Sequence, residues 1–137
     1  MFLAVTLLFS ACSSRQPVHP APTVEGRDVV IAVSTLKHEV PQFFTYLYQG
    51  KNISFFVLRL DNQVSSFFDA CVSCYPKKLG YKYDDGTVIC RACNMRFPVY
   101  RLEKGLGGCY PIKLEGRIEN GKYLIPLSSI EAEVGKF

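Results

Sequence analysis

The sequence has no tryptophan, only two histidines, no block of like charge and no long hydrophobic segment. Its apolar run over residues 1–11 is too short to cross a bilayer as a helix. The formal net charge of +4 is scattered, and Lys77-Lys78 is the longest basic run. Because nucleic-acid binding needs a basic stripe or patch, we expect no nucleic-acid partner.

Motifs of the common enzyme classes are also missing. The chain shows no P-loop, no glycine pattern of a dinucleotide site and no Ser-His-Asp order. Its carboxylates are too dispersed to suggest an acid–base pair. We therefore do not expect an enzyme in the ordinary sense, and a metal-binding or electron-transfer role stays open.

The residues that are present suffice for one folded domain. The chain has 137 residues, of which 48% are hydrophobic, and it includes eight Tyr and ten Phe. This content can bury a core, and the aromatic residues favour β structure. A metal site would therefore add to a core rather than replace one.

Four of the six cysteines form two Cys-x-x-Cys pairs, Cys71/Cys74 and Cys90/Cys93, with fifteen residues between the pairs. Each such turn directs two thiolates to one point. The intervening segment alternates, turns at Asp-Asp-Gly and continues with β-branched residues, which predicts a hairpin that brings the pairs together. The spacing thus predicts one metal ion or a small iron–sulfur cluster.

Other uses of these cysteines stay open. In an oxidising compartment they could form two disulfides, but a Cys-x-x-Cys disulfide closes a very short loop and removes little chain entropy. One pair could be a redox dithiol, which needs a helix N-terminus or a cation beside it, and only Arg91 is suggestive. Haem attachment is disfavoured because Tyr75 and Asn94 stand where it needs His.

The N-terminus resembles a bacterial lipoprotein signal. An apolar run over residues 1–11 ends in small residues before Cys12, the expected lipidation site, although a positive n-region is missing. Residues 12–26 are proline-rich and predict a flexible tether. The alternative is a buried N-terminal strand with Cys12 as a free thiol. We expect one β-rich metal-binding domain over residues 27–137, with a cysteine ribbon over residues 70–111.

Within that domain we predict a mainly β fold. It would be an antiparallel meander or sandwich-like sheet with an inserted zinc-ribbon-like double Cys-x-x-Cys hairpin and a short C-terminal helix. The expected strands span residues 28–35, 43–48, 53–60, 64–69, 112–118 and 123–127. Asn120-Gly121 is the strongest hairpin signal, and we expect Ser128 and Ser129 to cap a helix that extends to Val134.

Phe-Phe pairs recur at residues 43–44, 55–56 and 67–68. Because neighbours in a strand face opposite sides, each pair would place one ring on each face. This pattern predicts a sheet that is covered on both faces.

The remaining chemistry-bearing residues are a fifth downstream cysteine and the two histidines. Cys109 follows two glycines, and it could be a spare thiol or could reach the metal centre. We expect His19 to be a solvated linker residue and His38 to lie in a loop, with metal ligation a minor alternative for His38.

Several of these motifs resemble the FtrD-like membrane iron–sulfur protein domain over residues 28 to 130. They are Phe68-Asp-Ala-Cys71-x-x-Cys74, Gly80-Tyr81, Val88-Ile-Cys90-x-x-Cys93, Phe97-Pro98 and Gly107-Gly-Cys109-x-Pro111. The resemblance implies an extracytoplasmic, membrane-associated protein linked to iron uptake or membrane electron transfer. Asn94 and Tyr110 depart from the residues that usually stand at their positions. Carried over by position, the metal-associated residues are Cys71, Cys74, Cys90, Cys93 and Cys109.

Taken together, these features predict a protein anchored in the cell envelope by lipid and facing the periplasm or the extracellular side. It would hold an iron–sulfur cluster or iron and act as an accessory to a membrane transporter or redox complex. Cysteine-only ligation suits zinc and iron–sulfur clusters alike. The alternatives are a structural zinc-ribbon docking module and a thiol-disulfide redox protein.

Overall fold

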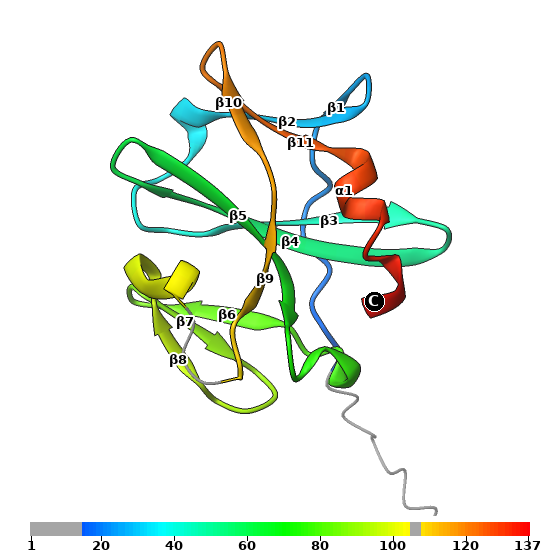
Figure 1. Ribbon diagram of the computed structural model, residues 1–137, viewed down its shortest axis with the longest axis vertical. Helices are drawn as coiled ribbons and strands as arrows, with labels where there is room; N and C mark the ends of the chain where they lie inside the picture. The colour runs from blue at the N-terminus through cyan, green and yellow to red at the C-terminus, as the bar shows by residue number, and fades with distance from the viewer. Residues whose placement is uncertain (1–14, 105–107) are drawn as a thin grey trace, which may run out of the picture.

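The computed structural model describes residues 15–104 and 108–137, and the expected signal over residues 1–11 and the lipidation site Cys12 lie outside them. The central sheet has the order β3-β4-β5-β9 and is antiparallel throughout (Figure 1). Its strands are β3 (Gln42–Tyr48), β4 (Lys51–Leu60), β5 (Gln63–Cys71) and β9 (Pro111–Leu114). The first three form the predicted meander.

A second antiparallel sheet covers one face of the central sheet. Its order is β1-β2-β11-β10, and its strands are β1 (Val24–Glu25), β2 (Asp28–Ala32), β11 (Lys122–Pro126) and β10 (Arg117–Glu119). A third sheet has the order β6-β7-β8, with β6 (Tyr81–Asp84), β7 (Thr87–Cys90) and β8 (Arg96–Pro98). It contains the predicted hairpin between the two cysteine pairs. It packs against the other face of the central sheet, near one end of that sheet (Figure 1).

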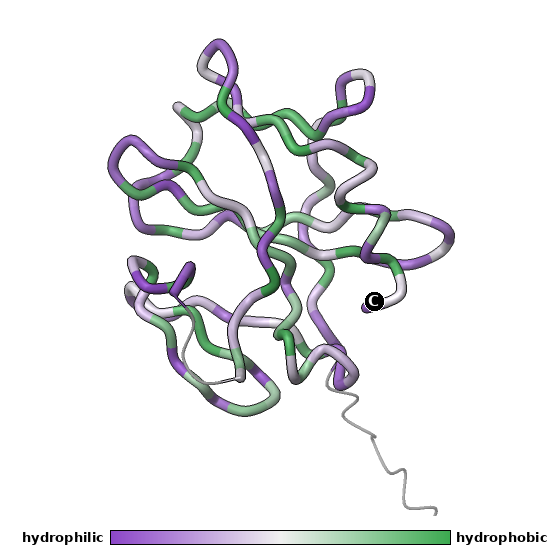
Figure 2. The backbone as a smooth tube through the Cα atoms, in the orientation of Figure 1, coloured by the Kyte–Doolittle hydropathy of each residue, from purple (hydrophilic) through white to green (hydrophobic). Residues whose placement is uncertain are grey.

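Tight turns join the hairpins. In the part of the chain that the structure describes, three two-residue turns have both residues at positive φ, and they are Gln49-Gly50, Asp85-Gly86 and Asn120-Gly121. Positive φ at both positions characterises the turn type that matches the twist of two adjacent strands. The tips of the hairpins are hydrophilic and the strands between them largely hydrophobic (Figure 2). The hairpin that we predicted at Asn120-Gly121 is confirmed by the pairing on either side of this turn.

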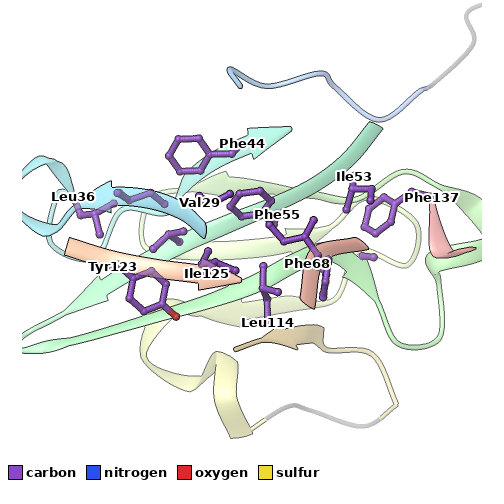
Figure 3. Packing of buried hydrophobic residues seen from close by; sticks show 14 residues of the cluster. Val29, Leu36, Phe44, Ile53, Phe55, Phe68, Leu114, Tyr123, Ile125 and Phe137 are labelled. Atoms are coloured by element: carbon purple, nitrogen blue, oxygen red, sulfur yellow. The ribbon is translucent and has the colours of Figure 1, made fainter. Parts of the chain in front are cut away.

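The Phe-Phe pairs divide between the two faces as the alternation predicts. Phe44, Phe55 and Phe68 lie in register across β3, β4 and β5 and belong to the hydrophobic cluster against the second sheet (Figure 3). Their sequence neighbours lie in register as well and contact the cluster against the third sheet: Phe43, Phe56 and Phe67. Full burial of each such ring contributes roughly 1.5–3 kcal/mol.

These two clusters, which we call core 1 and core 2, differ in composition. Core 1 lies between the central and second sheets and contains aliphatic and aromatic side chains, with Ile130 of α1 (Leu127–Glu131) and Phe137 closing it. Core 2 lies between the central and third sheets and also packs against η3 (Val99–Lys104). Its buried members include three cysteines: Cys71, Cys90 and Cys109.

The strand that we predicted over residues 112–118 is two strands. β9 pairs with β5 of the central sheet, whereas β10 pairs with β11 of the second sheet. Between them the chain passes Gly116, where an added Cβ would overlap the ring of Tyr123. That ring belongs to core 1, and its hydroxyl is 2.9 Å from the Ser66 hydroxyl. Glycine therefore lets the chain change sheets across a buried tyrosine.

The predicted capping of the C-terminal helix is wrong. α1 begins at Leu127, the N-cap position is Pro126, and no side chain caps this end. The Leu127 N–H instead donates to the Arg27 carbonyl at 2.9 Å. A neighbouring backbone carbonyl thus accepts a hydrogen bond from an N–H group that has no partner within the helix. A 3-10 turn, η4 (Val134–Lys136), continues the chain after the helix.

Residues 15–26, which we expected to be a flexible tether, lie against the domain (Figure 1). The His19 N–H donates to the Thr45 hydroxyl at 2.9 Å, and the Thr45 N–H donates to the Pro20 carbonyl at 3.1 Å. Thr45 lies in β3, an edge strand of the central sheet. Edge strands leave backbone groups without partners, and a proline-rich segment can still accept their hydrogen bonds. This explains the difference from the expected tether.

Candidate metal centre

The five cysteines of the domain come from three places that the fold brings together. Cys71 is the last residue of β5, and Cys90 is the last residue of β7. Cys109 lies just before β9, which pairs with β5 through Cys71 and Pro111. The end of β5, the end of β7 and the start of β9 therefore meet at one edge of core 2.

Backbone hydrogen bonds fix the two Cys-x-x-Cys turns. In the second turn the Asn94 N–H donates to the Cys90 carbonyl, and the Cys90 N–H donates to the Met95 carbonyl, each at 2.9 Å. Asn94 has a φ of 61°, a left-handed conformation that asparagine tolerates better than most residues. In the first turn the Val72 N–H donates to the Tyr110 carbonyl at 3.0 Å, which joins this turn to the residue after Cys109.

Four sulfur atoms form a compact group. The Sγ atoms of Cys71, Cys74, Cys90 and Cys109 all lie within 4.8 Å of one another. A metal–sulfur bond of about 2.3 Å places the sulfurs of a tetrahedral site roughly 3.8 Å apart. The group therefore has dimensions at which four thiolates can surround one ion, and Cys109 belongs to it.

The fifth sulfur lies at the outer edge of this group. Cys93 Sγ is 2.9 Å from Cys109 Sγ, and Cys109 Sγ is 3.0 Å from Cys71 Sγ. Cys71, Cys90 and Cys109 are 3%, 1% and 8% exposed, Cys74 is half-buried, and Cys93 is exposed. The structure thus gathers all five predicted cysteines. The compact group of four, however, contains Cys109 in place of Cys93, the second cysteine of the second pair.

Contact among the thiols separates their pKa values. Burial raises the pKa of Cys109 strongly, and its hydrogen bonds to Cys71 and Cys93 raise it further. Burial also raises the pKa of Cys74 to about 12. Burial raises the pKa of Cys90 too, against backbone N–H groups that lower it. Without a cation these thiols favour the protonated form, chiefly because burial disfavours the charged thiolate.

Two thiols behave in the opposite way. Burial acts to raise the pKa of Cys71, but the hydrogen bond between Cys71 and Cys109 and those from backbone N–H groups outweigh it, and the net pKa is lowered. The pKa of Cys93 is lowered for the same reasons, desolvation being outweighed by the Cys109 hydrogen bond and the Met95 N–H. The thiols therefore hydrogen-bond to one another. A bound cation would displace their protons and bind them as thiolates.

Tyr81 is a buried neighbour of the sulfurs to which the sequence analysis assigned no role. Its side chain is 1% exposed, and its hydroxyl makes no hydrogen bond of ordinary geometry within the described residues. The hydroxyl nevertheless lies near enough to Cys71 to lower the pKa of that thiol. A buried donor directed at a thiolate is a usual feature around metal-bound sulfur, because such hydrogen bonds stabilise its charge.

Asp69 is the second residue that the sequence analysis missed. It is 1% exposed, and its carboxylate accepts hydrogen bonds from the Tyr81 N–H at 2.6 Å and from Gln16 Nε2 at 2.8 Å. Gly80 has a φ of 65°, and a Cβ there would lie 2.7 Å from Asp69 Oδ1. The alternation of β5 could have identified Asp69, because it puts this residue on the same face as Phe67 and Cys71.

The histidines lie elsewhere. His38 is an exposed residue whose Nε2 is 3.2 Å from the Asp61 carboxylate, and it is not part of the sulfur group. His19 is not the solvated linker residue that we predicted. Its side chain is 20% exposed, its ring lies 4.9 Å from that of Phe43, and its Nε2 is 3.7 Å from Asp69.

The donor set fits iron held by thiolates, either as a mononuclear ion or within a cluster, and it equally fits zinc. The buried Tyr81 hydroxyl beside Cys71 adds a donor suited to a charged sulfur. Neither cysteine pair begins an α-helix in the described parts of the chain, so the helix dipole that activates many redox thiols does not act on them.

Comparison with known proteins bears on the same residues. Within residues 15–104 and 108–137 no helix has the length and apolar character needed to span a membrane. No curated protein matches the chain. A family model described as "Membrane iron-sulfur containing protein FtrD-like" matches residues 36–137, which include all five clustered cysteines. The chain belongs to the FtrD-like family of membrane iron–sulfur containing proteins.

Proposed function

We propose that this protein holds iron on its cysteines, as a mononuclear ion or an iron–sulfur cluster, and serves a membrane-bound iron-transport or electron-transfer system. The observation that carries the proposal is the group of four Sγ atoms within 4.8 Å, drawn from three separate segments. A fold that converges three segments on one set of soft donors suits a bound metal better than isolated thiols. The family match supports iron.

The residues of the chain have distinct parts in this function. Cys71, Cys74, Cys90 and Cys109 would hold the iron, which when bound supplies one-electron chemistry or is itself the cargo. Tyr81 would donate a hydrogen bond toward the Cys71 thiolate, and Asp69 fixes the backbone of Tyr81. Burial of three of the four cysteines limits the access of water and oxidants to the centre.

The location belongs to the same proposal. Lipid on Cys12 would anchor the protein in the cell envelope, on the periplasmic or extracellular side. Residues 15–26 would then keep the domain close to the membrane, because His19 and Pro20 are hydrogen-bonded to Thr45 of β3 and Val24–Glu25 pair with β2. The partner would be a membrane transporter or a redox complex, and no catalytic reaction of the domain's own is proposed.

Anaerobic purification tests the function directly. Protein purified from cells grown with iron should contain iron and show visible absorption from thiolate-to-iron charge transfer. Acid-labile sulfide would identify a cluster, and its absence with one iron per chain would identify a mononuclear centre. A colourless protein that holds one zinc per chain would contradict the iron function.

A structural zinc site is the second candidate, and one observation favours it. Cys71, Cys90 and Cys109 are themselves members of core 2, where the third sheet packs on the central one. A zinc ion there would fix the ribbon to the sheet and make the domain a docking module. Under this alternative, metal removal would unfold the third sheet, and the protein would show no redox signal in voltammetry.

A further inference from the structure

The cysteine centre has one more sulfur than a four-coordinate ion uses. Five cysteines converge, and the compact group contains four of them. The one left over, Cys93, is the most exposed of the five, whereas Cys71, Cys90 and Cys109 are buried. Solvent therefore reaches the centre first at Cys93.

Short contacts connect this exposed sulfur to the buried ones. Cys93 Sγ lies 2.9 Å from Cys109 Sγ, which in turn lies 3.0 Å from Cys71 Sγ. Sulfurs bound to one tetrahedral ion are roughly 3.8 Å apart, so an ion on Cys93 can bond Cys109 without a large movement of either residue. Cys109 is thus shared between an outer position and the buried group.

The backbone keeps Cys93 in that outer position. The residues on either side of it are tied by the Asn94 N–H bond to the Cys90 carbonyl and the Cys90 N–H bond to the Met95 carbonyl. The Arg91 N–H also donates to the Gly80 carbonyl at 3.0 Å, which joins the turn to the segment before β6. Cys93 is therefore a fixed part of the centre and not a thiol on a free loop.

We propose that Cys93 is the exchange ligand of the centre, the thiolate that a divalent metal ion binds first and from which the ion passes through Cys109 to the buried cysteines. This inference rests on the proposed metal-binding function and adds a route to it. A bond from the metal to Cys93 forms as a water ligand leaves. Bonds to Cys109, Cys71, Cys90 and Cys74 follow as the remaining water ligands leave, with the protons of these thiols released to solvent. The bond to Cys93 then breaks, and the metal keeps its oxidation state throughout.

Cobalt(II) and zinc(II) provide the test, because cobalt reports the number of bound thiolates through its absorption spectrum. The full chain, reduced and free of metal, is titrated with cobalt(II), and zinc(II) is then added to displace it. Cys93→Ser should bind one cobalt with the wild-type four-thiolate spectrum at equilibrium. Its rate of cobalt-for-zinc exchange should fall by about tenfold or more, a barrier increase of about 1.4 kcal/mol.

Cys74→Ser is the matched control, since Cys74 is also the second cysteine of its pair but lies within the compact group. This variant should lose the four-thiolate spectrum at equilibrium. The proposal is overturned if Cys93→Ser loses a thiolate from the cobalt spectrum, because Cys93 would then be a permanent ligand. It is also overturned if Cys93→Ser exchanges metal as fast as the wild type.

Alkylation provides a readout that does not depend on folding of a variant. Wild-type protein loaded with zinc(II) should react with iodoacetamide at Cys93 first, as peptide mass spectrometry would show, and should keep its zinc. Modification that begins at another cysteine, or loss of zinc together with Cys93 modification, would overturn the proposal. A wild-type chain that binds neither cobalt nor zinc would instead refute the metal-binding function itself.

Discussion

The two faces of the central sheet show two ways to complete a core with the same strands. On one face Phe44, Phe55 and Phe68 pack with aliphatic residues of the second sheet into core 1. On the other face Phe56 and Phe67 pack into core 2. Among the described residues core 2 has eleven buried members, and three of these are the clustered cysteines Cys71, Cys90 and Cys109.

This difference teaches that core 1 is completed mainly by hydrophobic burial, whereas under the proposed function core 2 would also depend on the metal that its sulfurs hold. The third sheet has only three short strands, and an isolated small sheet of this kind is marginal in water. It packs on the central sheet through the apolar side chains of Tyr81, Val88 and Phe97 as well as through the cysteine centre. We expect bound metal to matter greatly on one face and little on the other.

The largest expected effect is that of metal removal. Structural zinc sites contribute on the order of 10–16 kcal/mol of binding energy in small peptides, and an iron or zinc ion here would couple similarly to folding of the third sheet. After chelation, amide protons of β6, β7 and β8 should exchange rapidly, while those of β2 and β11 keep their protection. Hydrogen exchange with mass spectrometry measures both. Equal loss of protection on both faces would break the comparison.

Phe55 and Phe56 offer a matched pair of variants for the two faces. They are sequence neighbours, both are fully buried, and they belong to different cores. Each change to Ala should cost roughly 3–5 kcal/mol of unfolding free energy, since each leaves a cavity.

Only Phe56→Ala should also weaken metal binding. Phe56 packs on Tyr81, with ring centroids 6.2 Å apart, and Tyr81 lies beside the sulfurs. Denaturant titration and a metal competition assay would separate the two effects. Identical metal affinity in both variants would contradict the separation of the cores.

Metal affinity should fall as pH falls. The pKa values of Cys74, Cys90 and Cys109 are raised, so these thiols hold protons near neutral pH that metal must displace. Cys71 has a lowered pKa and contributes less to the dependence. Each displaced proton changes the binding free energy by about 1.4 kcal/mol per pH unit. Competition with a chromophoric chelator over about two pH units around neutrality measures the slope, and a flat profile would contradict the assignment.

The smallest expected effect comes from Tyr81→Phe. Loss of a hydrogen bond to the Cys71 thiolate should destabilise the metal-bound centre by on the order of 1 kcal/mol. The destabilisation should be larger for the reduced centre than for the oxidised one, because the reduced centre carries more negative charge. In iron-loaded protein the reduction potential should therefore fall by roughly tens of millivolts. A redox titration measures it, with Tyr83→Phe as the control because Tyr83 Oη instead contacts the Glu39 carbonyl and the Gly86 N–H. An unchanged or higher potential would remove Tyr81 from the metal site.

Much of the fold follows from local patterns in the sequence. Alternation placed the Phe-Phe rings on two faces, and the Asn-Gly and Asp-Gly signals located two hairpins. These predictions succeed because the period of a strand and the φ of a turn residue are properties of a few neighbouring residues. The doubled Cys-x-x-Cys spacing likewise predicted that the two pairs would meet.

The failures involve contacts between segments that are distant in sequence. Gly116 marks a change of sheet only because Tyr123 packs against it, and residues 15–26 are held by Thr45 of an edge strand. The placement of Cys109 among the four closest sulfurs depends on the pairing of β9 with β5. No local pattern contains this information.

The register of β3, β4 and β5 also restricts how the chain can change in length. A single added or deleted residue within β4 would move Phe55 and Phe56 to each other's sides and so disturb both cores at once. The residues at the hairpin tips do not place side chains in both cores. Among relatives of this protein, we therefore expect insertions to gather at Gln49-Gly50 and Asp61-Asn62, and the strand lengths between them to stay constant.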